Sequence, residues 1–312
     1  MKILVTGGAG FIGSHLVDRL IKEGYQTVII DDLSSGKRIN INKSAKFYKI
    51  DIVDKKIKDI FHKENFDIVF HLAAQKNVRT SIIDPIYDAN INILGSINVL
   101  ENCVKCKVRK FIFTSSGGAI YGDAKIMPTP ESYLPQPNSP YGIAKLAIDN
   151  YLYFYQLVHQ LNFVSFRLSN VYGPRQDPEG EAGVVAIFID KILSNKTLII
   201  NGSGRQTRDY IYVDDVVNVF VNALNKNACG YFNIGTGKET SVIKLYKIIN
   251  KVSGTTTKVK HGPPIKGELK WSALDARKAI KSFTWETMVK LNQGLKLTYQ
   301  WFRKEYEKKS KK

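Results

Sequence analysis

The sequence predicts an α/β fold with a doubly wound parallel sheet and a second, smaller α/β domain at the C-terminal end. Short apolar runs alternate with helical patterns through the first half of the chain, which is typical of βαβ units. These runs are continuously apolar, as strands are in a parallel sheet that is covered on both faces. A glycine-rich turn separates the first apolar run from the first helical pattern, and such turns bind ligands in sheets of this kind.

The expected elements follow from the spacing of the apolar residues. We expect strands at residues 2–6, 27–30, 47–50, 67–71, 110–114, 163–168 and 231–234. We expect helices at residues 11–22, 84–106, 139–160, 213–224, 240–252 and 284–307. Glycine, proline and polar residues cluster at 170–183 and 201–209, so the pattern changes after the sixth strand. The first domain is therefore predicted to comprise residues 1–169 plus 212–236, and the second residues 170–211 plus 237–312.

The net charge is strongly positive. The chain has 46 Lys+Arg against 28 Asp+Glu, a formal net charge of +18 and a pI of about 9.6. Such a charge attracts anions, including nucleotides and nucleic acids. Because the lysines are spread along the chain and no nucleic-acid-binding motif is present, we interpret the charge as a solvated basic surface with no specific nucleic-acid partner.

Several features predict a cytoplasmic protein without a membrane partner or a metal site. No apolar run reaches the roughly 18 residues that span a bilayer. The first strand begins at Lys2 and leaves no room for a signal peptide. Three cysteines cannot form a disulfide framework. Cys103 and Cys106 lie near the end of a helical pattern, where a thiolate is not activated, and the five histidines lack the spacing of metal ligands.

The glycine turn has the spacing of a dinucleotide-binding loop. Gly7 permits a tight turn, Gly10 lets the backbone approach a pyrophosphate, and Gly13 lets the helix pack on the strand. Backbone N–H groups at the helix start then hold the phosphate charge. Asp31 follows the second strand, where a carboxylate accepts hydrogen bonds from ribose hydroxyls and repels a 2′-phosphate, so NAD is favoured over NADP.

Tyr141 and Lys145 predict a general base. Ser139 is suited to cap a helix and Pro140 to begin it, which puts Tyr141 and Lys145 four residues apart on one helix face. A phenol has a pKa near ~10, and a neighbouring ammonium favours its ionised form. Hydroxyl groups at 114–116 end the preceding strand, where a side chain can hydrogen-bond a reacting oxygen.

Together these motifs resemble the extended short-chain dehydrogenase/reductase family and, within it, the UDP-glucose 4-epimerases (UDP-galactose 4-epimerases). The resemblance covers nearly the whole chain and implies a Rossmann-type NAD-binding domain followed by a UDP-sugar-binding domain. The motifs that carry it are TGGAGFIG (6–13), DDLSSG (31–36), DI (51–52), HLAAQ (71–75), NINILGS (90–96), TSSGGAIYG (114–122), SPYGIAK (139–145), RLSNVYGPRQ (167–176), GSGRQTRDYIYVDD (202–215) and FNIGTG (232–237).

The resemblance also implies roles for individual residues. It implies that Tyr141 is the proton acceptor, that Lys145 tunes it and holds the nicotinamide ribose, and that Ser116 assists. It implies NAD contacts from Gly7, Gly10, Phe11, Ile12, Gly13, Asp31, Asp51, Ile52, Leu72, Ala73, Lys76, Asn92, Tyr141 and Lys145. It implies that Ser116, Asn170, Val185, Arg208, Lys266, Glu268 and Ser272 hold the UDP-sugar.

Two departures from the family pattern bear on the site. An ungapped match counted back from Tyr121 puts Gly117 where the epimerases have serine, so we expect a local bulge that presents Ser116, with Ser115 as the alternative. The second diphosphate arginine of the family is also missing, and Lys266 is expected to replace it as a point charge.

The predicted function is NAD-dependent inversion of C4 of a UDP-hexose through a 4-keto sugar. Ser272 falls where the family has a residue beside C2 of the sugar, and a small side chain there predicts that N-acetylated forms also fit. The alternatives are a UDP-glucuronate epimerase, a decarboxylase, a 4,6-dehydratase or a non-catalytic NAD-sensing module. The resemblance further implies a homodimer formed through the helices at 84–106 and 139–160.

Overall fold

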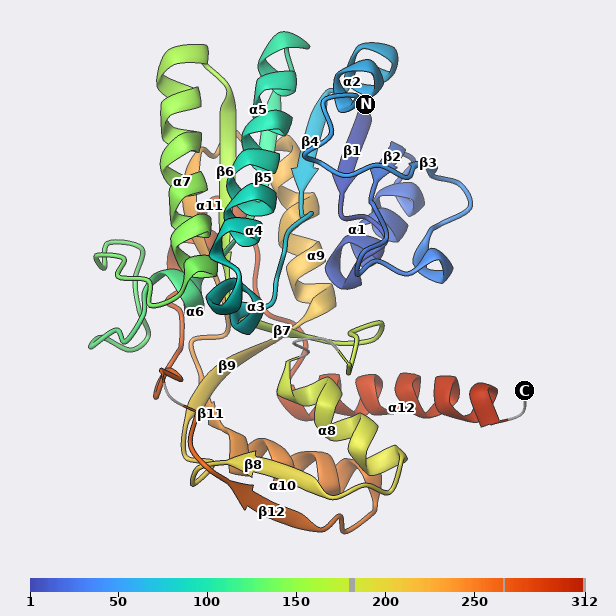
Figure 1. The fold of residues 1–312 in the computed structure, drawn as a ribbon, viewed down its shortest axis with the longest axis vertical. Helices are drawn as coiled ribbons and strands as arrows, with labels where there is room; N and C mark the ends of the chain where they lie inside the picture. Colours follow the sequence, from blue (N-terminus) through green and yellow to red (C-terminus); the bar gives the residue numbers. More distant parts are fainter. Residues whose placement is uncertain (180–182, 266, 311–312) are drawn as a thin grey trace.

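A seven-stranded parallel sheet forms the larger part of the molecule (Figure 1). The structure is a computed structural model that describes residues 1–179, 183–265 and 267–310. The strand order is β10-β6-β5-β4-β1-β2-β3, and all neighbouring strands are parallel. The strands are β1 (Lys2–Thr6), β2 (Gln26–Ile30), β3 (Lys46–Tyr48), β4 (Ile68–His71), β5 (Lys110–Ser116), β6 (Asn162–Leu168) and β10 (Gly230–Ile234). The predicted doubly wound fold is therefore confirmed.

The strand order reverses between β1 and β4. From β1 the chain proceeds outward through β2 and β3, then returns to β4 on the other side of β1. Connections on the two sides of such a reversal diverge, which opens a crevice at the carboxyl ends of the strands. The cofactor site is expected at this point.

Helices cover both faces of the sheet and bury a separate hydrophobic core on each. On one face lie α1 (Phe11–Lys22), α9 (Val213–Asn222) and α11 (Arg277–Phe283); on the other lie α2 (Ile57–Glu64), α5 (Ser96–Lys105) and α7 (Pro140–His159). Successive residues of β1 alternate between the two cores, Ile3 and Val5 in one and Leu4 in the other. This alternation explains why the strands read as continuous apolar runs.

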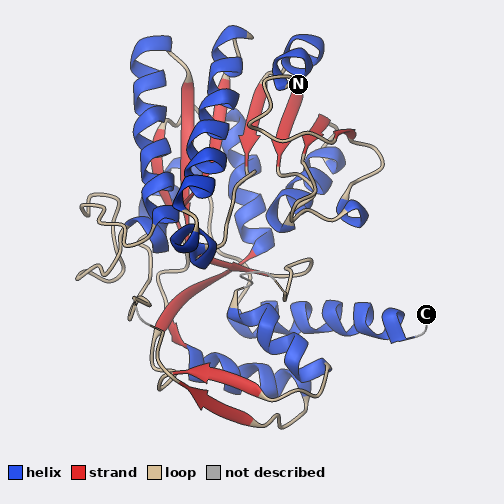
Figure 2. Cartoon of the chain, in the orientation of Figure 1, coloured by secondary structure: helices blue, strands red, loops and turns tan. Residues whose placement is uncertain are grey.

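The smaller part contains two further sheets (Figure 2). The first has the order β11-β9-β7, formed by β7 (Asn170–Tyr172), β9 (Thr207–Tyr212) and β11 (Glu239–Ser241). The second pairs β8 (Leu198–Asn201) with β12 (Val259–Gly262). They pack with α8 (Val184–Leu193), α10 (Val242–Ser253) and α12 (Leu291–Ser310).

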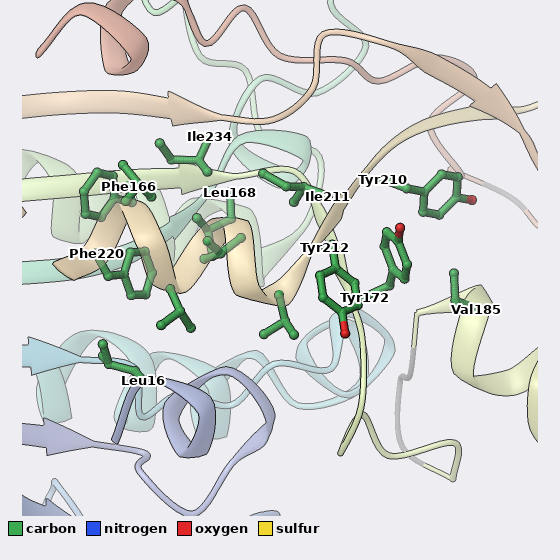
Figure 3. Close-up of a cluster of buried hydrophobic side chains, with 14 of the residues drawn as sticks. Leu16, Phe166, Leu168, Tyr172, Val185, Tyr210, Ile211, Tyr212, Phe220 and Ile234 are labelled. Atoms are coloured by element: carbon green, nitrogen blue, oxygen red, sulfur yellow. The ribbon is translucent and has the colours of Figure 1, made fainter. Parts of the chain in front are cut away.

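One core runs without interruption between the two parts. Figure 3 shows Leu16 and Phe220 of the larger part in the same cluster as Tyr172 and Val185, which belong to β7 and α8 of the smaller part. All four side chains are nearly fully buried. A shared, close-packed core fixes the relative position of the two parts and therefore of the side chains that each contributes to a site between them.

Two helix predictions differ from the structure. The segment 84–106 contains α4 (Pro85–Ala89), a π-helical turn at Asn90–Gly95 and α5, rather than one regular helix. The predicted helix at 284–307 is wrong at its start, because 284–290 lies between α11 and α12 without helical structure. The carboxylate of Asp215 accepts hydrogen bonds from the backbone N–H groups of Met288 and Val289 at 3.0 and 3.1 Å. This tertiary contact fixes the segment between the two helices.

The remaining helical turns are α3 (Val78–Ile83), α6 (Gly117–Ile120), η1 (Arg38–Asn40) and η3 (Ala223–Asn225). Within the described part of the chain, no helix is both long and apolar enough to cross a bilayer.

Candidate active site

The glycine turn between β1 and α1 is closed tightly by backbone contacts. Gly7 has a φ of +72°, and a Cβ at that position would lie 2.7 Å from the backbone nitrogen of Ala73. A Cβ at Gly13 would lie 2.2 Å from the carbonyl oxygen of Gly7. Gly10 begins α1 without a side-chain cap, so the N–H groups of the first helical turn remain available to a ligand. This turn therefore has the geometry expected of a cradle for the pyrophosphate of a dinucleotide.

A cavity of about 380 Å³ opens from the glycine turn along the carboxyl ends of the strands. It lies at the reversal of strand order between β1 and β4. Most of the residues predicted from the sequence line it: Gly7, Gly10, Phe11, Ile12, Gly13, Asp31, Asp51, Ile52, Leu72, Ala73, Lys76, Ser116, Tyr141, Lys145 and Asn170.

The carboxylate of Asp31 is fixed at the end of β2. It accepts hydrogen bonds from the backbone N–H groups of Ala9 at 3.0 Å and Leu33 at 2.9 Å. Burial raises the pKa of Asp31, while these two hydrogen bonds lower it. A Cβ at Gly36 would lie 2.6 Å from a carboxylate oxygen, so the loop passes directly over Asp31. The carboxylate is thus held at the position where an adenosine ribose would meet it.

Tyr141 and Lys145 lie on the first turns of α7, as predicted. The hydroxyl of Ser139 caps the helix by accepting from the N–H of Gly142 at 3.2 Å, and Pro140 begins it. The ammonium of Lys145 donates to the carbonyl of Thr114 at 2.9 Å and lies 5.8 Å from the centre of the Tyr141 ring. The cap and the proline set where α7 starts, and that start places both side chains over the end of β5.

Lys145 is almost completely buried. Burial lowers the pKa of its ammonium to about 8, and the charges of Asp149 and Asp88 oppose this by raising it. The pKa of Lys145 is therefore close to neutral pH, so small changes in nearby charge alter its protonation.

The two serines at the end of β5 have different surroundings. Ser115 is buried, and its hydroxyl donates to Asp149 at 3.4 Å. Ser116 is half-buried, precedes α6 and makes no capping hydrogen bond to it. Because side chains alternate along a strand, the two hydroxyls are expected on opposite sides of the sheet, although both residues border the cavity. A Cβ at position 117 would lie 2.5 Å from Leu274 Cδ1, so a side chain at Gly117 would require the Leu274 side chain to move.

Asn92 does not line the cavity. It lies in the π-helical turn, and its amide nitrogen donates to the carbonyl of Gln75 and to Asp88, both at 2.9 Å. Its amide oxygen accepts from the N–H of Gln75, also at 2.9 Å. In the structure Asn92 therefore holds the loop that carries Lys76.

A buried hydrogen-bonded chain connects Asn92 to the glycine turn. The hydroxyl of Ser96 donates to the carbonyl of Asn92 at 2.6 Å and lies 2.9 Å from Nε2 of His71. Nδ1 of His71 lies 2.7 Å from the hydroxyl of Thr6, which accepts from the N–H groups of residues 72 and 73. Burial lowers the pKa of His71 to about 3, so this imidazole is neutral and its proton lies on Nε2, the atom that faces an acceptor.

The predicted UDP-sugar residues fall into two groups. Asn170 borders the cavity, whereas Val185, Arg208, Glu268 and Ser272 lie outside its lining. The guanidinium of Arg208 pairs with Glu268 at 3.2 Å and donates to the carbonyl of Leu269 at 2.8 Å. Lys266 lies outside the described residues.

Ser272 and Val185 are both buried beside this region. Ser272 faces the turn after β5, because a Cβ at Gly118 would lie 3.5 Å from its hydroxyl. Val185 is in the first turn of α8 and packs in the shared core. The structure thus brings Ser272 next to residues 115–119, called the serine turn below, although the two are far apart in the sequence.

Tyr210 is a candidate site residue that the sequence reasoning missed. It is buried two residues after Arg208, and its hydroxyl has no hydrogen-bond partner among the described residues. A buried hydroxyl without a partner is costly, which points to a ligand that supplies one. The motif around Arg208 contained this tyrosine, but only the tertiary structure reveals the unpaired group.

Comparison with known proteins places the chain in a family. The model of the NAD dependent epimerase/dehydratase family matches residues 3–235. The structure of a UDP-glucose 4-epimerase from Thermotoga maritima with UDP-glucose is similar with a TM-score of 0.96 and 49% identity, covering 98% of this chain and 99% of that one. A UDP-glucose 4-epimerase from Thermus thermophilus in complex with NAD matches with a TM-score of 0.94 and 39% identity, covering 97% and 99% of the two chains.

An epimerase named for a different sugar is also similar to this chain. A UDP-N-acetylglucosamine 4-epimerase from Methanobrevibacter ruminantium, in complex with UDP-N-acetylmuramic acid, matches with a TM-score of 0.93 and 34% identity over 97% of this chain and 98% of that one. The family match covers well over half of the chain, and the glycine turn and Asp31 suit NAD as the cofactor. The chain belongs to the NAD-dependent epimerase/dehydratase family.

Proposed function

We propose that the protein is a UDP-hexose 4-epimerase that interconverts UDP-glucose and UDP-galactose through a 4-keto sugar. The observation that carries this proposal is the convergence of Tyr141, Lys145 and Ser116 on the cavity that begins at the glycine turn. When bound, NAD would supply the acceptor and then the donor of the hydride at C4 of the sugar.

The residues that line the cavity would hold NAD. The glycine turn and the start of α1 bind the pyrophosphate, and Asp31 receives the adenosine ribose. The residues proposed to contact NAD are Gly7, Gly10, Phe11, Ile12, Gly13, Asp31, Asp51, Ile52, Leu72, Ala73, Lys76, Tyr141 and Lys145. For Asn92 we propose an indirect role, through Gln75, because its side chain is already engaged there.

Tyr141, Lys145 and Ser116 form the proposed catalytic group, which moves the proton of the 4-hydroxyl. Tyr141 accepts this proton as general base and returns it after the sugar has turned in the site. Lys145 favours the phenolate by its charge and binds the nicotinamide ribose. Ser116 donates a hydrogen bond to the 4-oxygen, where negative charge develops.

The UDP part is proposed to bind at the junction with the smaller part. Arg208 is suited to a diphosphate because its guanidinium donates two parallel hydrogen bonds. Asn170, Val185, Glu268 and the Tyr210 hydroxyl are proposed to surround the nucleotide, and Lys266 to add a point charge. Ser272 lies beside the sugar, where its small side chain accepts N-acetylated hexoses.

The residues of the site argue against two of the alternatives. Elimination of water across C5–C6 in a 4,6-dehydratase needs an acid–base pair near the serine. Positions 117–119 are Gly-Gly-Ala, so no such group is present in this turn. Both members of the Tyr141/Lys145 pair are present and close, which disfavours a non-catalytic NAD-sensing module.

We also infer a homodimer formed through two helical segments. Ile86 and Leu94, in the segment from α4 to the π-helical turn, are more than half exposed. Ile143, Phe154 and Leu157 of the adjacent α7 are exposed as well. A patch of large apolar side chains on neighbouring helices marks a protein–protein interface. We further propose a division into domains at 1–169 plus 212–236 and 170–211 plus 237–312, and a cytoplasmic location, which the small number of cysteines supports.

The deciding experiment offers three substrates to the purified protein without added NAD. UDP-glucose, UDP-N-acetylglucosamine and UDP-glucuronate are incubated separately, and the products are identified by chromatography and NMR. We expect the 4-epimers of the first two. Loss of water or of carbon dioxide would identify a dehydratase or a decarboxylase, and turnover of UDP-glucuronate alone would shift the assignment to that sugar series.

A further inference from the structure

Asp149 is a buried carboxylate on α7 that the proposed reaction does not use. It is only 1% exposed and lies one helical turn after Lys145, on the same face. Its Oδ2 accepts from Nε of Arg167 at 2.9 Å and from the hydroxyl of Ser115 at 3.4 Å. Its Oδ1 accepts from the hydroxyl of Ser165 at 2.6 Å. One carboxylate therefore connects the catalytic helix to two strands of the sheet.

These hydrogen bonds adjoin the serine turn. Ser115 precedes Ser116 and is paired with Arg167 across β5 and β6. Arg167 is held in turn by the hydroxyl of Tyr121, to which it donates at 3.0 Å. The network thus anchors β5 at its last residues, where the chain leaves the sheet and the position of Ser116 is decided.

The same carboxylate supplies charge to Lys145. The charged and titratable groups near this ammonium are Asp149 and Tyr141 on its own helix, Asp88 on α4 and the neutral His71 on β4. Arg167 on β6 lies beyond Asp149 and pairs with it. Burial lowers the pKa of Lys145, and Asp149 is the largest of the influences that raise it. A buried ammonium without a counter-charge loses its proton readily.

We propose that Asp149 is a positioning residue of the catalytic group, which fixes the serine turn and the Lys145 ammonium relative to one another. The inference deepens the proposed function, on which it rests. A buried ion pair gives little net stability compared with apolar packing, so a location between the serine turn and the catalytic lysine is better explained by placement of those groups.

The first test measures the protonation of Lys145 without turnover. The NAD-loaded protein is prepared with ε-¹³C-lysine, and the Lys145 resonance is assigned as the one lost in Lys145→Arg. We expect Asp149→Asn to lower the titration midpoint of this resonance by about one pH unit, because it removes a nearby negative charge. Asp215→Asn is the matched control, since Asp215 is equally buried and its carboxylate accepts from the backbone N–H groups of Met288 and Val289, outside the lining of the cavity.

The second test separates positioning from stability. With UDP-glucose, Asp149→Asn should lower kcat about tenfold or more with little change in KM, and should move the alkaline limb of kcat to lower pH. Asp215→Asn should lower the melting temperature and leave that limb in place. If Asp149→Asn does not fold because Arg167 is left unpaired, the double variant Asp149→Asn/Arg167→Gln removes both charges and should move the midpoint in the same direction by less.

The outcomes can be told apart. A Lys145 midpoint that is unchanged in the variant that folds would overturn the inference. A wild-type protein that converts none of the UDP-sugars would refute the proposed function, while the NMR midpoint would still report whether Asp149 acts on Lys145.

Discussion

Leu274 lies directly against Gly117, since a Cβ at position 117 would come within 2.5 Å of Leu274 Cδ1. Leu274 is fully buried, and its N–H donates to the carboxylate of Asp209 at 3.3 Å. The adjacent backbone also pairs with Thr129. Because Leu274 is buried and its backbone is held from both sides, a side chain at 117 would have to displace the Leu274 side chain, and we expect the hydroxyl offered to the substrate to come from a neighbouring residue.

This contact leads to a prediction about the two serines. Ser116→Ala should lower kcat on the order of 10²-fold, because a donor to the developing oxyanion is removed. Ser115→Ala should lower it much less, since the Ser115 hydroxyl is engaged with Asp149. Steady-state kinetics with UDP-galactose compare the two variants. Equal and small effects would show that Tyr141 works without a serine partner.

Tyr141→Phe should reduce epimerisation by about 10²–10⁴-fold, the usual contribution of a general base. NAD should remain bound, because the glycine turn and Asp31 are untouched. The cofactor content is measured after gel filtration, and turnover with UDP-glucose is followed by product analysis. A Phe variant that is nearly as active as the wild type would exclude Tyr141 as the base.

Ser272 predicts the range of sugars. Its hydroxyl is adjacent to position 118, so a phenol at this site would fill the space beside the serine turn. Ser272→Tyr should abolish activity on UDP-N-acetylgalactosamine while keeping activity on UDP-galactose, because steric exclusion acts on the acetamido group alone. The ratio of kcat/KM for the two substrates is the measurement. An unchanged ratio, or a wild type without N-acetyl activity, would contradict this assignment.

Glu64 predicts a pH-dependent contribution to stability. Hydrogen bonds from Lys46 and Tyr48, with a further one from Lys2, lower the pKa of this carboxylate from 4.5 to about 2. Because the folded pKa lies below the unfolded one, the stabilisation is complete above about pH 4.5 and is lost as the pH falls towards about 2. Glu64→Gln should therefore cost on the order of 1 kcal/mol at pH 7, since Lys46 is exposed and Lys2 partly exposed, so solvent screens these ion pairs.

Urea denaturation at several pH values checks this expectation. The difference in unfolding free energy between wild type and Glu64→Gln should shrink as the pH is lowered from 5 to about 2. A difference that stays constant with pH would mean that the ionised carboxylate contributes nothing and that packing alone is altered.

The main sheet could be predicted from the sequence because its strands are buried on both faces. Strands with no polar alternation stand out as apolar runs, and each lies within about two residues of its predicted bounds. The start of α7 was predictable for a local reason as well, since Ser139 and Pro140 define a helix N-terminus by their own chemistry.

The misplaced elements share a different cause. The segment 284–290 has apolar residues at helical spacing, but Asp215, far away in the sequence, captures its backbone N–H groups. The π-helical turn at Asn90–Gly95 likewise turns Asn92 toward Gln75 rather than toward the cavity. Both outcomes depend on partners that local periodicity does not reveal.

The sequence by itself determined the sheet, the glycine turn, Asp31 and the pair of Tyr141 with Lys145. These features arise from residues close together in the chain, whose spacing and chemistry act locally. Only the tertiary structure decided that Leu274 packs against Gly117, that Ser115 is bound to Asp149, and that Ser272 lies beside the serine turn. Each of these depends on close packing or hydrogen bonding between segments more than thirty residues apart, where a difference of a few tenths of an ångström decides which side chain can be accommodated.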